Sequence, residues 1–124
     1  MAEPIDIVRD FCAACEGGDI DAILDFFTDD AVYHNMPVAA VQGKDAIRAT
    51  FDMFMTGVDK IEFRVLNISA AGSTVLTERV DVFVLPTGTI ELPVMGTFEL
   101  VDGKIAAWRD YFDLNQYMQQ LPQQ

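Results

Sequence analysis

The sequence predicts a single α+β domain in which helices cover one side of a strongly curved sheet. Hydrophobic residues recur every three or four positions up to about residue 57, which is typical of amphipathic helices. From Lys60 onward they alternate with polar residues, which is typical of strands. The 124 residues contain no linker or repeat, so we expect one domain over residues 1–124, with a deep apolar pocket on the concave face of the sheet.

The first half is expected to hold three helices and one short strand. A helix should follow Pro4 and end at Gly17-Gly18, because apolar side chains recur at helical spacing between them. Asp19 is expected to cap a second helix over "DIDAILDFF". The segment "DDAVYHNMP" is expected to form a brief strand ended by its proline, and "GKDAIRATFDMFMTG" a third helix that closes at Gly57.

The second half is expected to form an antiparallel meander. Four strands are predicted at about 61–69, 74–85, 89–101 and 104–113. The segments between them, "AAGS", "PTGT" and "VDGK", each place a glycine where a tight hairpin turn needs one. The tail "LNQYMQQL" is expected to add one or two helical turns.

Composition excludes several classes of partner. The net charge of −12 and the absence of a basic stripe argue against nucleic acid and anionic membranes. No apolar run approaches the roughly 20 residues of a membrane helix, and the N-terminal sequence lacks the pattern of a signal peptide, so a cytoplasmic protein is expected. Cys12 and Cys15 lie within a helix and His34 is the only histidine, which favours free thiols and predicts no metal site.

The most informative stretch is "TVLTERVDVFVLPTG". Side chains alternate between the faces of a strand, so Arg79 and Asp81 share one face with Phe83 and Leu85. The opposite face carries only Val80, Val82 and Val84 in this part of the strand. An arginine and an aspartate among apolar neighbours would both be costly to bury unpaired, so they are expected to pair.

The same alternation brings three further polar residues to the cavity. Asp110 shares a face with Ala106, Trp108 and Phe112, and Tyr33 shares a face with Asn35, while His34 points away. The polar residues expected in the cavity are therefore Tyr33, Asn35, Arg79, Asp81 and Asp110.

Two interpretations of this polar cluster remain open from the residue pattern. Buried Arg–Asp pairs occur for purely structural reasons. However, two carboxylates face one arginine, and a carboxylate, a phenol and an amide together can hold one water molecule. The second interpretation is a site that activates water next to a carboxyl able to donate a proton.

Four segments, "YHNMP", "TERVDV", "PTG" and "GKIAAWRDYFDL", resemble the limonene-1,2-epoxide hydrolase family, a branch of the cone-shaped NTF2-like or SnoaL-like fold. The resemblance covers almost the whole chain. It implies that Asp110, Tyr33 and Asn35 hold the attacking water, that Asp81 protonates the epoxide oxygen, and that Arg79 bridges the two carboxylates. It also implies hydrolysis in one step to a vicinal diol, without a covalent intermediate and without a cofactor.

The expected pocket is apolar apart from this cluster, which suits a small cyclic or terpenoid epoxide. Trp108 is included as a candidate, although core packing suits it better. The predicted substrate contacts are Phe83, Leu92, Val94, Phe112, Val58, Tyr117 and Trp108. The resemblance further implies a homodimer formed through the outer face of the sheet, where Val80, Val82 and Val84 lie.

Three rival functions remain open, because this fold serves many functions. A ketosteroid-isomerase-like enzyme would use one carboxylate as base and a phenol or protonated acid as oxyanion donor. A SnoaL-like polyketide cyclase would use an inward aspartate in a roomier cavity. A non-catalytic binding domain would hold a small molecule with an affinity that does not depend on Asp81 or Asp110.

Overall fold

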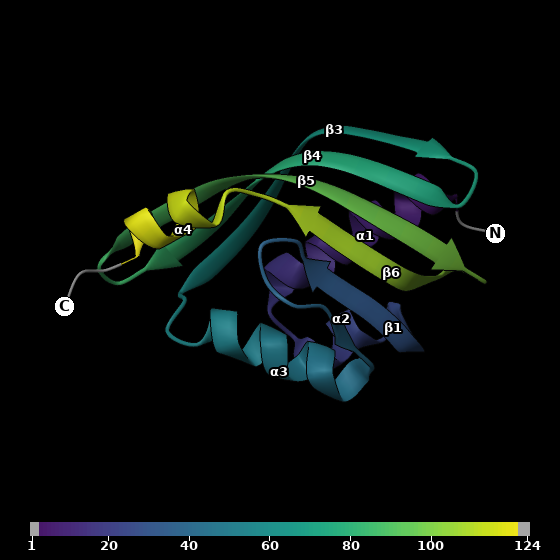
Figure 1. Ribbon diagram of the computed structural model, residues 1–124, viewed down its shortest axis with the longest axis horizontal. Coiled ribbons are helices and arrows are strands. Elements are labelled where there is room, and N and C mark those ends of the chain that lie inside the picture. Colours follow the sequence, from purple (N-terminus) through teal and green to yellow (C-terminus); the bar gives the residue numbers. More distant parts are fainter. Residues whose placement is uncertain (1–2, 122–124) are drawn as a thin grey trace.

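The computed structural model describes residues 3–121 and shows a curved sheet that arches over the helices (Figure 1). Four helices are present among these residues: α1 (Pro4–Gly17), α2 (Ile20–Leu24), α3 (Lys44–Met55) and α4 (Leu114–Gln120). The strands of the same region are β1 (Phe27–Asn35), β2 (Val41–Gln42), β3 (Lys60–Ala71), β4 (Thr74–Leu85), β5 (Gly88–Val101) and β6 (Lys104–Tyr111). The α+β class, the curvature and the helical cover of one side are confirmed.

The sheet has the strand order β2-β1-β6-β5-β4-β3. The meander from β3 to β6 is antiparallel throughout, as predicted. β1 pairs in parallel with β6, which makes the sheet mixed and places a strand from the first third of the chain beside its last strand. This pairing aligns Tyr33 with Trp108 and Asn35 with Asp110. It therefore brings together residues that lie far apart in the sequence.

Local signals account for the helix ends. Pro4 stands in the first turn of α1, where its missing N–H costs nothing, and Gly18 ends the helix in the left-handed region at φ 76°. The Asp19 side chain accepts hydrogen bonds from the backbone N–H groups of Asp21 and Ala22, and thereby caps α2 as predicted. Asp113 caps α4 in the same way through Asn115 and Gln116.

Several predicted boundaries were wrong. α2 ends at Leu24 rather than continuing through "DFF", and Phe27 already belongs to β1, which is longer than the brief strand expected. Phe27 pairs with Ile105 of β6, and its ring packs edge-on against Phe11 in the core. β6 ends at Tyr111 rather than 113, and the two-residue β2 was not predicted.

The predicted alternation along β6 fails at one residue. In the register of β5 and β6, Leu100 faces Ile105 and Glu99 faces Ala107, so Ala106 is the extra residue of a β-bulge. Ile105 therefore lies in the core, whereas Ala106 does not share the face of Trp108 as predicted. Beyond the bulge the alternation resumes, which leaves Trp108 and Asp110 facing inward.

A cluster of aromatic rings in the core packs beside the pocket. The ring of Phe11 on α1 meets Trp108 edge-on at 5.0 Å between centroids. Trp108 is stacked between Tyr33 at 4.2 Å and Phe98 at 5.4 Å. Such contacts fix ring orientations, so Tyr33 is held against a rigid support. No helix between residues 3 and 121 has the length and apolar character required to cross a membrane.

Candidate active site

A row of four residues crosses the sheet at the centre of the site. Thr77 of β4 pairs with Gly96 of β5, Gly96 pairs with Asp110 of β6, and Asp110 pairs with Asn35 of β1. Arg79 lies two residues along β4 from Thr77, so its side chain points to the same face of the sheet. The polar cluster is thus assembled from four adjacent strands of a single sheet.

Arg79 is 1% exposed and uses all five of its N–H groups. Nε and Nη2 each donate to a different oxygen of Asp81, at 2.9 Å in both cases. Nη2 also donates to Asp110 Oδ2 at 2.8 Å, and Nη1 donates to Asp110 Oδ1 at 3.2 Å. The remaining N–H of Nη1 donates to the Thr77 hydroxyl at 3.1 Å. A guanidinium has five donors in a planar fork, so one side chain holds both carboxyl groups by two bonds each.

The two carboxyl groups differ in their surroundings. Asp110 accepts a third hydrogen bond, from Trp108 Nε1 at 2.7 Å, whereas Asp81 has only its two bonds from Arg79. Donors favour the ionised form of a carboxyl group. Burial raises the pKa of Asp81 above the ordinary aspartate value, an effect that the charge of Arg79 opposes and that of Asp110 reinforces. The two carboxyl groups are therefore not equivalent in their surroundings.

Gly96 provides the space in which this cluster fits. A Cβ placed on Gly96 would lie 2.6 Å from Asp110 Oδ1 and 2.9 Å from Thr77 Oγ1, and closer still to Arg79 Nη1. Real Cβ atoms essentially never show contacts this short, so a side chain here would force the cluster to shift. The Thr77 hydroxyl, which accepts from Arg79, also donates to the Gly96 carbonyl at 3.3 Å. The ion pair therefore packs directly against the backbone of Gly96.

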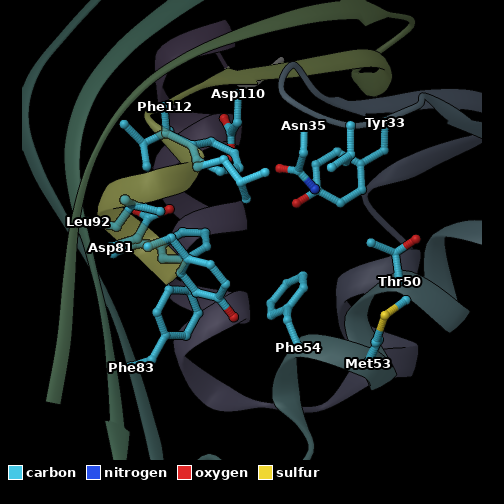
Figure 2. A pocket seen from close by; sticks show the side chains of 15 residues that line it. Tyr33, Asn35, Thr50, Met53, Phe54, Asp81, Phe83, Leu92, Asp110 and Phe112 are labelled. Atoms are coloured by element: carbon cyan, nitrogen blue, oxygen red, sulfur yellow. The ribbon is translucent and has the colours of Figure 1, made fainter. Parts of the chain in front are cut away.

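Tyr33 and Asn35 complete the polar end of the pocket, where they lie beside each other and across from Asp81 (Figure 2). Burial raises the pKa of the Tyr33 phenol, and the nearby charge of Asp110 raises it further. The phenol therefore remains a neutral hydrogen-bond donor and acceptor. Asp110, Tyr33 and Asn35 thus offer one carboxylate, one hydroxyl and one amide to the same part of the cavity.

The pocket has a volume of about 290 Å³. Apart from the polar cluster its walls are mostly apolar, and exposed side chains from α3, α4 and the loop after β1 surround its opening. It is lined by Tyr33, Asn35, Val38, Thr50, Met53, Phe54, Phe63, Asp81, Phe83, Leu92, Val94, Asp110, Phe112, Leu114 and Tyr117. A small concave apolar site with a few convergent polar groups is the usual form of a small-molecule site.

Comparison with known proteins identifies the family. The model of the limonene-1,2-epoxide hydrolase catalytic domain matches residues 2–123. The chain belongs to this family. It is also 36% identical over 107 residues to epoxide hydrolase EphG of Mycobacterium tuberculosis, a match that covers 86% of this chain and 71% of EphG. Together these matches support epoxide hydrolysis as the activity of the chain.

Solved structures agree with this assignment. The structure of an LEH-like epoxide hydrolase from M. tuberculosis superposes with a TM-score of 0.82 at 32% identity, over 94% of this chain and 86% of that one. A protein described as a SnoaL-like polyketide cyclase, from Shewanella putrefaciens, superposes with a TM-score of 0.87 at 16% identity, over 97% and 96% of the two chains. The second match shows the shared fold alone.

In this limonene-1,2-epoxide hydrolase family member, the five polar residues predicted from strand alternation all meet in one place. Arg79 stands behind the pocket wall and the other four line it. Of the predicted substrate contacts, Phe83, Leu92, Val94, Phe112 and Tyr117 also line it.

Two of the predicted substrate contacts, Trp108 and Val58, do not line this pocket. Trp108 is fully buried below the pocket and hydrogen-bonds Asp110, so it supports the site without lining it. Val58 follows α3 and lines a second pocket instead. His34 faces away from the cluster as predicted, with a ring nitrogen 2.9 Å from the Val38 carbonyl oxygen.

Sequence reasoning missed Thr77 and Gly96. Both lie on the inward face by the same alternation that found Arg79, so Thr77 could have been included. The sequence gives no sign that position 96 must be glycine. This requirement arises only because the Arg79 side chain extends over that position.

The two cysteines take no part in the polar cluster. Both are buried, and burial raises the pKa of the Cys12 thiol to about 12 and that of Cys15 well above its ordinary value. Thiols in such surroundings remain protonated and behave as small apolar core residues.

Proposed function

We propose that this chain adds water to a small apolar epoxide, cyclic or terpenoid, and releases a vicinal diol in a single push–pull step. The observation that supports this most strongly is the pair of carboxyl groups held by one buried guanidinium at the wall of an apolar pocket. One carboxyl group can give a proton while the other takes one, and both act on a substrate in the same cavity.

Asp110 is assigned the role of general base. Of the roughly four acceptor sites of a carboxylate, three are occupied by donors from Arg79 and Trp108, which leaves one site on Oδ2. A water molecule hydrogen-bonded there would also be within the reach of Tyr33 and Asn35, which line the same part of the pocket. The two latter side chains orient the water so that its lone pair points at the epoxide carbon.

Asp81 is assigned the role of general acid. Burial raises its pKa, which favours the protonated form that a general acid needs. In the step, the water oxygen forms a bond to the ring carbon and the carbon–oxygen bond of the ring breaks. Asp110 takes the proton of the water while Asp81 donates its own to the ring oxygen. The net charge of the cluster does not change, which suits a buried site. Each positioned proton transfer typically contributes about 10²–10⁴ in rate.

The pocket favours a small apolar substrate. Its volume of about 290 Å³ lies near the lower limit of typical ligand pockets, about 300–1,000 Å³. Leu92, Val94 and Phe112 offer no hydrogen bonds, so much of the substrate surface would meet apolar side chains. Limonene-1,2-epoxide and cyclohexene oxide are the first substrates to test.

The mechanism is tested by single turnover in ¹⁸O-labelled water with enzyme in excess. Direct attack by water predicts that the first diol formed carries the label. An unlabelled first diol would mean that a carboxylate oxygen entered the product through an ester, and the roles of Asp110 and Asp81 would then be wrong. If neither epoxide gives diol, isomerase, cyclase and binding assays become the next tests.

We also propose that the chain forms a homodimer through the outer face of the sheet. Of the predicted contact residues, Val82 is already 1% exposed in the single chain, because Glu62 and Glu91 flank it on the neighbouring strands. The more exposed apolar pair on this face is Met95 and Tyr111, which are cross-strand partners. Light scattering on the native protein and on Met95→Lys checks the proposal, because a dimer through this face should dissociate in the variant.

A further inference from the structure

A second apolar pocket adjoins the proposed catalytic pocket. It has a volume of about 340 Å³ and lies between the end of α3, the hairpin between β4 and β5, and α4. Four residues line both pockets: Met53, Phe54, Phe83 and Tyr117. The two cavities are thus separated only by a thin wall of side chains.

The wall is aromatic and contains no ion pair. The Phe83 ring meets Phe54 edge-on at 6.0 Å and Tyr117 edge-on at 6.4 Å between centroids. Figure 2 shows Phe54 and Phe83 on the side of the catalytic pocket away from Asp110 and Asn35. Phe83 is held on a central strand, whereas Phe54 is half-buried in the last turn of α3.

Two strands lead from the catalytic residues into the second pocket. On the inner face of β4, Asp81 is followed by Phe83 and then by Leu85, which lines the second pocket. Strands rise about 3.3 Å per residue, so Leu85 lies about 13 Å along the strand from Asp81. On β5 the inward series passes in the same direction from Leu92 to Ile90.

The lining of the second pocket selects the chemistry of its ligand. Val58, Leu85, Pro86, Ile90 and Leu121 supply apolar surface, and the pocket contains no charged residue. The hydroxyl of Thr56 already donates to the Asp52 carbonyl oxygen. Thr87 and Tyr117 add hydroxyl groups to the lining. A hydrocarbon chain fits the apolar part of this lining, whereas a charged group would lose its hydration without gaining a charged partner.

We propose that this second pocket is a binding site for the apolar tail of an extended epoxide, whose ring lies at Asp81 and Asp110. Phe54 and Phe83 then set the chain length at which the tail passes from the first pocket to the second. This proposal rests on the proposed function and extends its substrate class from small epoxides to epoxides with a linear apolar tail.

The test measures kcat/KM for terminal epoxides from 1,2-epoxyhexane to 1,2-epoxydodecane, each divided by the value for cyclohexene oxide. In the native enzyme this ratio should rise by about fourfold for each methylene that enters the second pocket. Val58→Trp and Leu85→Trp fill the pocket and should abolish the rise for the longest substrates. Val101→Trp, at an exposed site of β5 outside both pockets, is the matched control. The ratio in this variant should still rise with chain length. Phe54→Ala should shift the rise to shorter chains.

The proposal fails if the kcat/KM ratio of the native enzyme does not rise with chain length. It also fails if the rise is the same in both tryptophan variants as in the native enzyme. Calorimetric affinities for hexane-1,2-diol and dodecane-1,2-diol give a readout that does not depend on turnover. If no epoxide is hydrolysed, the proposed function fails. The tail site is then judged by whether Val58→Trp removes the preference for the longer diol.

Discussion

Thr77 and Gly96 are cross-strand partners in β4 and β5, and together they fix the position of Arg79. The Thr77 hydroxyl accepts the one Arg79 N–H that no carboxylate takes, and it donates in turn to the Gly96 carbonyl. Gly96 leaves open the volume that the guanidinium and Asp110 occupy. Two residues without an obvious chemical role thus determine where the two proposed catalytic carboxyl groups stand.

Gly96→Ala should remove most of the activity. The new methyl group would overlap Arg79 and Asp110, both of which are buried and held in place by several hydrogen bonds. Overpacking of this kind typically costs about 1–3 kcal/mol of stability. Thermal unfolding and kcat for limonene-1,2-epoxide check the prediction. A variant with native activity would show that the cluster is far more adaptable than its contacts suggest.

Thr77→Val should lower kcat more than it raises KM. The substitution leaves one N–H of Arg79 buried without an acceptor, which typically costs about 1–3 kcal/mol, and the guanidinium is expected to shift away from its position. Thr77→Ser retains the hydroxyl and should restore most of the activity. Equal losses in the valine and serine variants would instead indicate that packing of the Thr77 methyl group is what matters.

Asp110→Asn and Asp81→Asn should each lower kcat by about 10²-fold or more, since each removes one proposed proton transfer. Both side chains keep their volume, so circular dichroism should show an intact fold. Substantial turnover by Asp110→Asn would contradict its assignment as the base. If the two variants bind the diol as well as the native enzyme does, the loss belongs to chemistry and not to binding.

Arg79→Lys should be nearly as damaging as loss of either aspartate. Lysine keeps the charge, yet a single ammonium group cannot donate two bonds to each of two carboxyl groups. Breaking a buried pair typically costs about 3–5 kcal/mol, so the unfolding midpoint in urea should also fall. An active and stable lysine variant would show that the charge of Arg79 suffices and that its planar geometry does not matter.

The pH dependence of stability should reveal the proton on Asp81. Between the ordinary aspartate pKa and its raised folded-state pKa, Asp81 is ionised when unfolded and protonated when folded. The folded state then binds more protons, so this residue's contribution to the free energy of unfolding falls as pH rises through that window. The difference in unfolding free energy between the native protein and Asp81→Asn, measured by urea titration at several pH values, isolates the effect.

The proton on Asp81 should also determine how kcat/KM depends on pH. If Asp81 donates its proton to the epoxide, kcat/KM must fall as the pH rises through the raised pKa of Asp81. On the alkaline side, kcat/KM is expected to stay constant until the pH has passed the ordinary aspartate pKa and to fall at higher pH. A rise in kcat/KM over the range in which Asp81 loses its proton would contradict its role as the acid.

The sequence by itself determined the fold class and most of the site. Alternation is a local property of each strand, and the apolar neighbours of Arg79, Asp81 and Asp110 indicated that all three face inward before any pairing was known. Helix ends at Pro4, Gly18 and Asp19 follow from backbone chemistry that acts over a few residues. The register of the long hairpins is set by their short turns.

Only the tertiary structure decided features that depend on residues far apart in the chain. The parallel pairing of β1 with β6 brings Tyr33 and Asn35 to Asp110 across more than half of the sequence. The bulge at Ala106 and the position of Val58 depend on how whole strands and helices pack, as does the need for glycine at position 96. Local patterns report which way a side chain faces. What it meets there is fixed by packing, because a close contact depends on the placement of two segments at once.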